Sequence, residues 1–321
     1  MKKRLSWVDN LRGVGIVLVI WGHTNVPLPI EHIIYSFHMP LFFMISGYLY
    51  RKKDNIRKVI EGKINGLIIP YFIFAIPSFF LAVLKGDGLV ESLKNLLYLN
   101  GLIGWNAPLW FLLVLFFVSV IFALIDHWNI SLDLMGGIAF VLGFFISNTG
   151  IYFMGLDKII YGLLFYYFGL QINKLMKGKF YQKNSYLLLI ASLVLNIIFG
   201  FFLNPRISIY RNELGNYFFF VIAALFGSLA LFIVVTKWGK WPKLIEFYGK
   251  NSIVIIGTHY FFLYGFRLVE KVFHTDILVS RDSLLISILE LIVILIGTIP
   301  IVFIYNRLIK SIIKINLEQS A

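Results

Sequence analysis

The chain has 321 residues, of which 59% are hydrophobic and only 14% are charged, and its mean hydropathy is +0.84. Soluble domains carry about 25% charged residues, so this composition predicts a protein built for lipid. The sequence has no cysteine, which excludes disulfides, thiolate metal sites and a cysteine nucleophile. The net charge of +13 does not predict nucleic-acid binding, because the basic residues lie in short loops between apolar segments and not on one face of a soluble domain.

Apolar runs of about 20 residues, the length that crosses a bilayer, follow one another along the chain. They predict an all-α integral membrane protein, a polytopic bundle of about ten transmembrane helices. We see no internal repeat and no appended soluble domain, so residues 1–321 are expected to form a single transmembrane domain. The predicted spans are 11–27, 33–50, 66–84, 108–125, 134–149, 153–173, 185–203, 215–236, 251–269 and 284–306, of which the fifth is short.

Basic residues between the spans predict the orientation. If the N-terminal "MKKR" is cytoplasmic, the segments on that side hold 20 of the 29 lysines and arginines, and the opposite side holds 8. Arg12 accounts for the remaining one. Because loops rich in lysine and arginine stay in the cytoplasm, both termini are predicted to be cytoplasmic, and the protein is expected in the plasma membrane. The same loops would attract anionic membrane lipids.

The stretch "DNLRGVGIVLVIWGH", residues 9–23, carries an ionisable side chain at each end of an apolar run. Eleven helical residues separate Arg12 from His23 by about 16 Å along the axis and about 20° in rotation, so both side chains point to nearly the same face. Ionisable groups within a span usually face a protein interior or a water-filled cavity and mark functional sites. The alternative is that Arg12 reaches the headgroups and His23 the opposite interface, but their shared face favours a functional pair.

The next apolar stretch, "YSFHMPLFFMISGYLY" at 35–50, runs in the opposite direction. His38 therefore enters from the half of the membrane that holds His23, either as its partner or as a hydrogen-bonded core histidine. Pro40 cannot donate to the carbonyl four residues earlier, so we expect the helix to open there. Ser46 is a small packing residue or a substrate contact.

Four further polar or aromatic positions leave two interpretations each. Asp9, three residues before Arg12, either orients the guanidinium or caps the helix. Trp110 is an interface anchor or a wall of the acceptor site. His259 makes an interhelical hydrogen bond or contacts the site, and Lys63 is a positive-inside residue or a donor contact. Loops 85–107 and 204–214 contain Trp, Asn, Arg and Glu, which suit carbohydrate.

Several motifs together resemble the membrane acyltransferase 3 family. Its members are multi-helix O-acyltransferases that decorate bacterial surface polysaccharides, including oligosaccharide O-acetylases of the fucose 4-O-acetylase type. The resemblance covers most of the chain, and the first two motifs in tandem are its most specific part. The matching stretches are "LRGVGIVLVIWGH" (11–23), "FHMPLFFMISGYL" (37–49), "IIPYF" (68–72), "PLWFL" (108–112) and "NSIVIIGTHYFFL" (251–263).

The resemblance implies that Arg12 and His23 are the residues of acyl transfer. This chain departs from the family at one place. Members commonly have an arginine pair just before the "IPY" element, where this sequence has Lys63 and then Gly66. Lysine cannot reproduce the bidentate geometry with which arginine binds phosphate.

The chemistry of O-acyl transfer requires a base for the acceptor hydroxyl or a nucleophile that carries the acyl group. Histidine suits the task because its pKa of roughly 6.5 keeps it partly neutral near pH 7. We therefore expect His23 to act as general base or transient acyl carrier. Arg12 and Lys63 are expected to bind the donor, acetyl-CoA or another acyl-CoA, whose extended pantetheine arm is comparable in length to the separation of Arg12 from His23. No metal site is predicted.

These expectations combine into an integral-membrane O-acyltransferase. It would move an acyl group, in the first instance acetyl, from cytoplasmic acyl-CoA to a carbohydrate acceptor, a surface polysaccharide or its lipid-linked precursor. The alternative is a transporter or flippase of a lipid-linked oligosaccharide, but such proteins often show repeated halves, and we detect none. The candidate substrate contacts are Asp9, His38, Ser46, Trp110 and His259.

Overall fold

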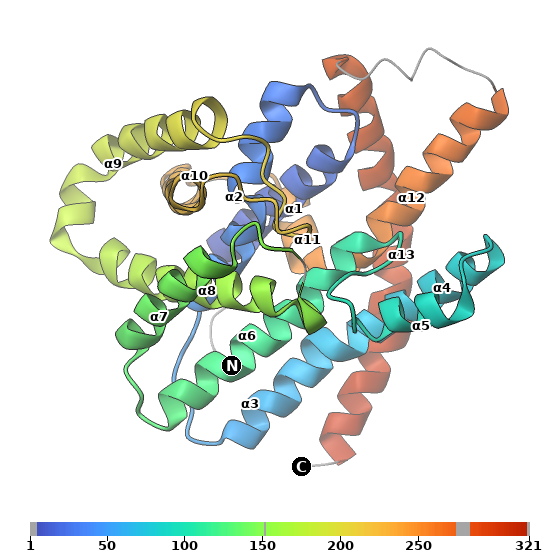
Figure 1. Cartoon of the computed structure of the whole chain (residues 1–321), viewed down its shortest axis with the longest axis horizontal. Coiled ribbons are helices and arrows are strands. Elements are labelled where there is room, and N and C mark those ends of the chain that lie inside the picture. Colours follow the sequence, from blue (N-terminus) through green and yellow to red (C-terminus); the bar gives the residue numbers. More distant parts are fainter. Residues whose placement is uncertain (1–4, 151, 274–282, 320–321) are drawn as a thin grey trace.

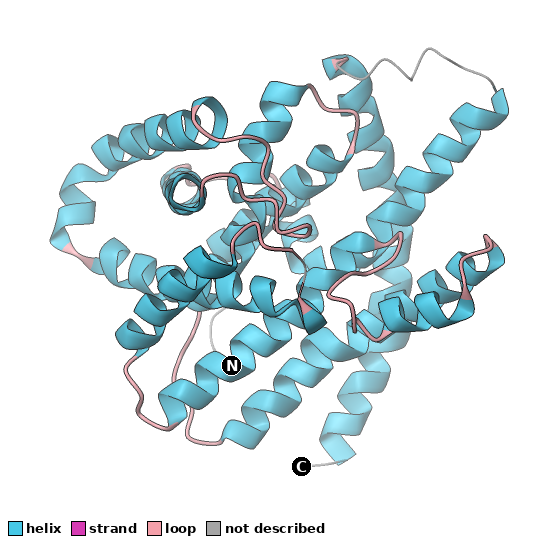
Figure 2. Cartoon of the chain, in the orientation of Figure 1, coloured by secondary structure: helices cyan, strands magenta, loops and turns pink. Residues whose placement is uncertain are grey.

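The computed structural model describes residues 5–150, 152–273 and 283–319 (Figure 1). Throughout these ranges the chain is built from helices and loops (Figure 2), apart from an isolated antiparallel bridge between Ser208 and Glu213. The helices are α1 (Ser6–His23), α2 (Leu28–Tyr48), α3 (Ile56–Lys63), η1 (Ile64–Ile68), α4 (Ile69–Leu84), α5 (Leu89–Leu96), η2 (Ala107–Leu109), α6 (Trp110–His127), α7 (Leu132–Ile146), η3 (Phe153–Gly155), α8 (Leu156–Lys177), α9 (Lys179–Ile197), η4 (Ile198–Phe202), α10 (Tyr217–Lys237), α11 (Lys243–Lys250), α12 (Ser252–Phe273) and α13 (Leu284–Gln319).

The prediction of a polytopic all-α membrane protein is confirmed. Among the described residues, eight helices are long and apolar enough to cross a membrane. The other two predicted spans are also helical, but each falls short by this measure. The polar residues Asp9 and Arg12 lower the hydropathy of α1, and α7 is short at 15 residues.

Two helices differ from their predicted outlines. The span predicted at 66–84 begins ten residues earlier, because α3 continues through the π-helical turn η1 into α4. The expected opening at Pro40 is wrong as a helix break, since α2 continues through Pro40 from Leu28 to Tyr48. Proline removes one backbone hydrogen bond, but neighbouring helices keep such a helix continuous in a membrane protein.

Close backbone contact joins α1 to α11. A Cβ atom at Gly13 would overlap the carbonyl oxygen of Ile245, and one at Gly249 would overlap the carbonyl oxygen of Asp9. Glycine is therefore required on both helices at this crossing. Because α11 is only eight residues long, these contacts fix where Lys250, its last residue, lies relative to α1.

A second pair of glycines joins α2 to α8 in the same way. Gly47 faces the carbonyl oxygen of Tyr166, and Gly169 faces the carbonyl oxygen of Met44, with no room for a Cβ atom at either glycine. Through these two crossings, α1 and α2, which hold the residues singled out by the sequence, each pack directly against a second backbone.

The helices differ in how much of their surface is covered. In α6 and in α10, 61% of the residues in the apolar 18-residue stretch are buried inside the protein. In the continuous helix formed by α9 and η4, the corresponding share is 22%. Figure 1 shows α9 at the margin of the molecule, on the left. Its uncovered side is a stripe of large apolar side chains at helical spacing, as expected of a surface that faces lipid. The exposed residues of this stripe are Tyr186, Leu187, Ile190, Leu193, Val194 and Ile197.

Candidate functional site

His23 is the last residue of α1, and it faces a cavity of about 690 Å³. We call this space the His23 cavity; Tyr35, Trp105, Arg206 and Tyr264 are among the residues that line it. The volume lies in the range of about 300–1,000 Å³ that small-molecule sites occupy.

The end of α1 is fixed by polar contacts within the membrane region. The backbone N–H of Thr24 donates to the carbonyl of Trp21 at 3.1 Å and closes the helix. The backbone and side-chain amides of Asn25 donate to the buried Glu290 carboxylate of α13 at 2.8 and 3.1 Å. The Trp21 indole N–H donates to the Ser287 hydroxyl at 3.2 Å. These contacts hold His23, between Trp21 and Thr24, in a defined position.

The imidazole of His23 is surrounded by polar and aromatic groups. The Tyr35 hydroxyl lies 3.0 Å from Nδ1, and the Tyr260 hydroxyl lies 3.4 Å from the same nitrogen. The ring of His259 stacks on that of His23 with centroids 5.5 Å apart and an interplanar angle of 22°. Since both hydroxyls use Nδ1, Nε2 is the ring nitrogen that they leave available.

Behind Tyr35 lies an ion pair that connects loop 203–216 to α2. The Arg206 Nε donates to Glu31 Oε1 at 2.7 Å, and the guanidinium lies 4.0 Å from the centroid of the Tyr35 ring. Burial by itself lowers the pKa of Arg206, but Tyr35 and Glu31 raise it by more, so the group is always protonated. Glu31, Arg206 and Tyr35 thus form a chain of contacts that ends at Nδ1 of His23.

Aromatic side chains form much of the remaining wall. Trp110 and Tyr264 line the cavity, as do Trp105 and His38. The Lys85 ammonium lies 5.0 Å from the ring centroid of Trp105 and 4.9 Å from that of Tyr264, which fixes these two rings relative to each other. Flat aromatic faces of this kind suit the apolar faces of sugar rings.

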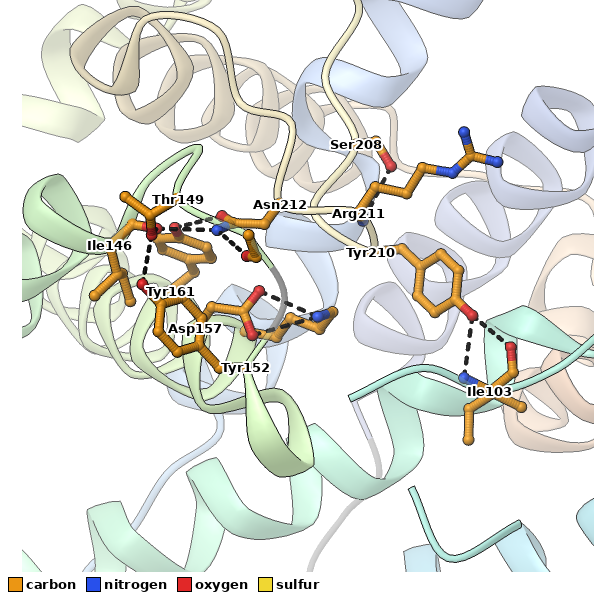
Figure 3. A network of polar contacts seen from close by, with 12 residues as sticks. Ile103, Ile146, Thr149, Tyr152, Asp157, Tyr161, Ser208, Tyr210, Arg211 and Asn212 are labelled. Atoms are coloured by element: carbon orange, nitrogen blue, oxygen red, sulfur yellow. Dashed lines mark hydrogen bonds and ion pairs between the residues drawn. The ribbon is translucent and has the colours of Figure 1, made fainter. Parts of the chain in front are cut away.

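Loop 203–216 is held rigidly although it has no regular secondary structure (Figure 3). The side-chain amide of Asn212 donates to the carbonyls of Ile146 and Gly150 at 2.9 and 2.6 Å. The Tyr161 hydroxyl donates to the Asn212 Oδ1 at 2.7 Å. One buried asparagine therefore ties the loop to α8 and to the segment after α7.

The loop has a second anchor on its other side. The Tyr210 hydroxyl donates to the carbonyl of Ile103 and accepts from the Ile103 N–H (Figure 3). Burial raises the pKa of Tyr210, so its hydroxyl stays neutral and can donate. Beneath the loop, Asp157 and Lys158 at the start of α8 form an ion pair at 3.1 Å, both side chains with 0% exposure. Removing one partner of such a buried pair would be strongly destabilising, because it would leave the other charge buried and unpaired.

Arg12 lines a different space, a cavity of about 400 Å³ that we call the Arg12 cavity. Five of its lining residues are cationic, and none is a carboxylate; the five are Arg12, Lys53, Lys58, Lys63 and Lys250. Asp9, behind this lining, pairs with Arg12 at 3.9 Å, and Glu246 pairs with Lys250. The π-helical turn η1 contributes Gly66 and Leu67 to the wall. The excess of positive charge suits a ligand with several negative charges.

The two cavities are neighbours. Phe111 of α6 and Ile256 of α12 line both of them, and both side chains are buried. Phe111 also packs edge-on against Phe42, with ring centroids 5.8 Å apart. An apolar wall thus separates the space at Arg12 from the space at His23.

The family comparison agrees with this geometry. A family model described as an acyltransferase domain matches residues 5–307. The chain belongs to the acyltransferase 3 family. No curated protein and no solved structure matches the chain. This acyltransferase is a multi-pass membrane protein, and its family implies an acyl donor and an acceptor.

The residues predicted from the sequence divide between the two cavities of the acyltransferase. His38 and Trp110 line the His23 cavity, whereas Ser46 and Lys63 line the Arg12 cavity. Asp9 is buried beside Arg12, as expected of a residue that orients the guanidinium. His259 is fully buried behind His23 and bonds through Nδ1 to the carbonyl of Ile255 at 2.8 Å, so it supports the site without lining it.

Sequence reasoning did not single out several residues of the His23 cavity. Glu31, Tyr35 and His38 follow one another on α2 at spacings of four and three residues, which places them on one face of the helix. This spacing is the sequence pattern that could have identified Tyr35 and Glu31. Arg206 belongs to a loop that the sequence marked as a carbohydrate contact, but its pairing with α2 is a long-range contact. Among the described residues, no group of three or more His, Cys, Asp or Glu side chains could hold a metal ion.

Proposed function

We propose that this acyltransferase moves an acetyl group from acetyl-CoA to a hydroxyl of a surface polysaccharide or its lipid-linked precursor. The observation that carries the proposal is the arrangement along α1. One helix places His23 in a large cavity with aromatic walls and Arg12 in a neighbouring cavity with five cations and no carboxylate in its lining. In this proposal residues 1–321 act as a single domain in the plasma membrane, with both termini in the cytoplasm.

The Arg12 cavity suits the phosphates of coenzyme A. Arg12 supplies a planar fork of donors for a phosphate, and Lys53, Lys58, Lys63 and Lys250 supply point charges. In this chain Lys63 and its neighbours would take the place of the arginine pair common in the family. An acyl-CoA anchored there needs only its uncharged pantetheine arm to extend along α1 towards His23.

The proposed reaction uses His23 as the base. Nδ1 donates its hydrogen to the oxygen of Tyr35, which leaves Nε2 free to take the proton of the acceptor hydroxyl. The acceptor oxygen then attacks the thioester carbonyl carbon, a C–O bond forms, and the C–S bond breaks. The departing coenzyme A thiolate takes the proton from Nε2, so the imidazole returns to its starting state. A histidine in this role contributes about 10²–10⁴-fold to the rate.

The wall between the cavities imposes one condition on this reaction. The thioester has to pass Phe111 and Ile256 to come within reach of His23. Both are side chains without polar atoms, so a rotamer change or a small shift of α6 or α12 opens the wall without breaking a hydrogen bond from either side chain. Small collective helix motions of this kind occur in microseconds to milliseconds.

A gene deletion followed by complementation tests the proposal. Surface glycan is purified from the parent strain, from the deletion strain and from strains that carry wild-type or His23→Ala protein. Its O-acetyl content is then measured by proton NMR before and after mild alkali. We expect the acetyl signals to disappear in the deletion strain and to return only with the wild-type gene. Normal O-acetylation of a glycan that is exported in smaller amounts would contradict the proposal and support a transporter.

A further inference from the structure

We infer that the acceptor carries a negatively charged group, a phosphate or a carboxylate, and that Arg211 and Arg267 bind it in the His23 cavity. This inference rests on the proposed function, because it assigns the substrate class of the same cavity. The residues that line the cavity carry a net positive charge, and a neutral sugar would not need such a charge.

The His23 cavity has an excess of positive charge. Arg206, Arg211 and Arg267 line it, and Glu31 is the one carboxylate among its lining residues. Arg206 already uses Glu31, at 2.7 Å, and stacks on Tyr35. Among the described residues that line the cavity, no second carboxylate is present to pair with Arg211 or Arg267.

The side chain of Arg211 is exposed, whereas its backbone is held in place by hydrogen bonds. Its backbone N–H donates to the Ser208 hydroxyl at 3.3 Å, and the next residue is Asn212, which ties the loop to α8. Figure 3 shows the Arg211 side chain extending away from Asn212. A ligand that pairs with this guanidinium would meet a group whose backbone is already fixed, which lowers the entropic cost of binding.

Arg267 lines the same cavity from another element, α12. It is exposed, and its guanidinium lies 6.0 Å from the ring centroid of Tyr264, which lines the cavity together with Trp105. A sugar stacked on these rings would have its substituents within the region that Arg267 lines. Arginine pairs with phosphate and carboxylate through two parallel hydrogen bonds, so two arginines in the lining of one cavity suit an anion better than a neutral hydroxyl.

Two sources supply such an anion to a surface-glycan acyltransferase. The first is an acidic group of the glycan itself, a uronic acid or a sugar phosphate. The second is the diphosphate that joins a lipid-linked precursor to its isoprenoid anchor. Both present the same chemistry to Arg211 and Arg267, and the experiment separates them.

The test measures probe binding to the purified full-length protein in phosphatidylcholine nanodiscs by thermophoresis. Saturating coenzyme A occupies the Arg12 cavity throughout, so that anions cannot bind there unnoticed. The probes are methyl glucoside, methyl glucuronide, glucose-1-phosphate and farnesyl diphosphate. We expect a charged probe to bind about tenfold more tightly than methyl glucoside, the gain typical of one charge-assisted hydrogen bond.

Three variants assign that preference to residues. Arg211→Gln and Arg267→Gln should each weaken binding of the charged probe about tenfold and leave methyl glucoside unchanged. The matched control is Arg57→Gln, since Arg57 is exposed on α3, pairs with Glu61 at 2.9 Å and lines neither cavity. Retained coenzyme A binding shows that each variant is folded.

The outcomes separate this inference from the proposed function. Preference for the glucuronide or the sugar phosphate places the charge on the glycan, and preference for farnesyl diphosphate places it on the lipid anchor. Equal binding of charged and neutral probes, no binding of any charged probe, or a preference that survives both substitutions overturns the inference. Failure of the wild-type protein to bind coenzyme A contradicts the proposed function instead, and loss of the probe preference in Arg211→Gln and Arg267→Gln but not in Arg57→Gln then still assigns the anion site to the His23 cavity.

Discussion

One helix, α1, contributes to both cavities, with Arg12 in its first half and His23 as its last residue, and the two cavities differ in chemistry. At His23, hydrogen bonds and aromatic contacts from α2, α12 and loop 203–216 restrain the imidazole. At Arg12, four lysines on long side chains line the same cavity, and Asp9 of the same helix pairs with the guanidinium at 3.9 Å. The first environment fixes the orientation of one ring, and the second concentrates positive charge.

This difference teaches how the work of the site is divided. A general base has to be held within a few tenths of an ångström of its productive position. A polyanion such as coenzyme A is attracted by summed charge, which tolerates movement of each lysine. Substitution of His23 should therefore lower the catalytic rate, and substitution of Arg12 should lower the affinity for the acyl donor.

The largest effect is expected from His23→Ala. Loss of the base should lower kcat by about 10²–10⁴-fold. Coenzyme A affinity should stay within about twofold, since His23 does not line the Arg12 cavity. Acetyl transfer from radiolabelled acetyl-CoA to purified glycan measures the first quantity and equilibrium dialysis the second. A His23→Ala protein that transfers acetyl at the wild-type rate but fails to bind coenzyme A would reverse the assignment of the two residues.

Arg12→Gln should act on affinity. Removal of a charged partner from a phosphate costs about 1.5–3 kcal/mol, so KM for acetyl-CoA should rise about 10–100-fold with a smaller change in kcat. The Arg12→Lys variant keeps the positive charge but loses the planar pair of donors. Its KM for acetyl-CoA should lie between the values of the wild type and of Arg12→Gln. An unchanged KM in Arg12→Gln would show that the lysines alone bind the donor.

Gly249→Ala should affect the Arg12 cavity through the backbone. The added methyl group overlaps the carbonyl oxygen of Asp9, so α11 has to move away from α1 and take Lys250 with it. Such overpacking costs about 1–3 kcal/mol of stability. Thermal unfolding in detergent should show the loss, with a rise in KM for acetyl-CoA. Gly265→Ala on α12 is the control, because nothing lies within 4 Å of a Cβ there.

The smallest effect is expected from Tyr35→Phe. The change removes the hydroxyl 3.0 Å from Nδ1 of His23 but keeps the ring on which Arg206 stacks. One neutral hydrogen bond contributes about 0.5–1.5 kcal/mol, so kcat should fall about 3–10-fold with KM for acetyl-CoA unchanged. The pH dependence of kcat should also shift, which a purely structural role of Tyr35 would not cause. A rise in KM with constant kcat would contradict this positioning role.

The sequence predicted those parts of the fold that depend on local composition. Hydropathy located helices at all ten predicted positions, because apolar runs of about 20 residues have few alternatives in a membrane. It missed the helical start of the third span, since α3 is polar and carries Arg57, Glu61 and Lys63. It also treated the weakly apolar α1 correctly as a helix, although Asp9 and Arg12 lower its hydropathy.

The site was predictable only where it is local in sequence. Arg12 and His23 were singled out by their spacing on one helix, and His38 and Trp110 by neighbouring motifs, and each of the four lines one of the two cavities. The partners that define the chemistry come from far along the chain: Arg206 bonds to a residue 175 positions away, and Tyr260 to one 237 positions away. No periodicity or motif spacing reports such pairings, which depend on how the helices cross.

The wall formed by Phe111 and Ile256 has a consequence beyond acyl transfer. Two polar cavities placed in series along one helix would form a conduit for protons and ions if they joined, and the membrane potential would drive current through it. Hydrophobic constrictions exclude water and thereby ions. In the proposed reaction the thioester passes these two apolar side chains, which would then also serve as electrical insulation. Smaller polar residues in their place should make the membrane leak to ions.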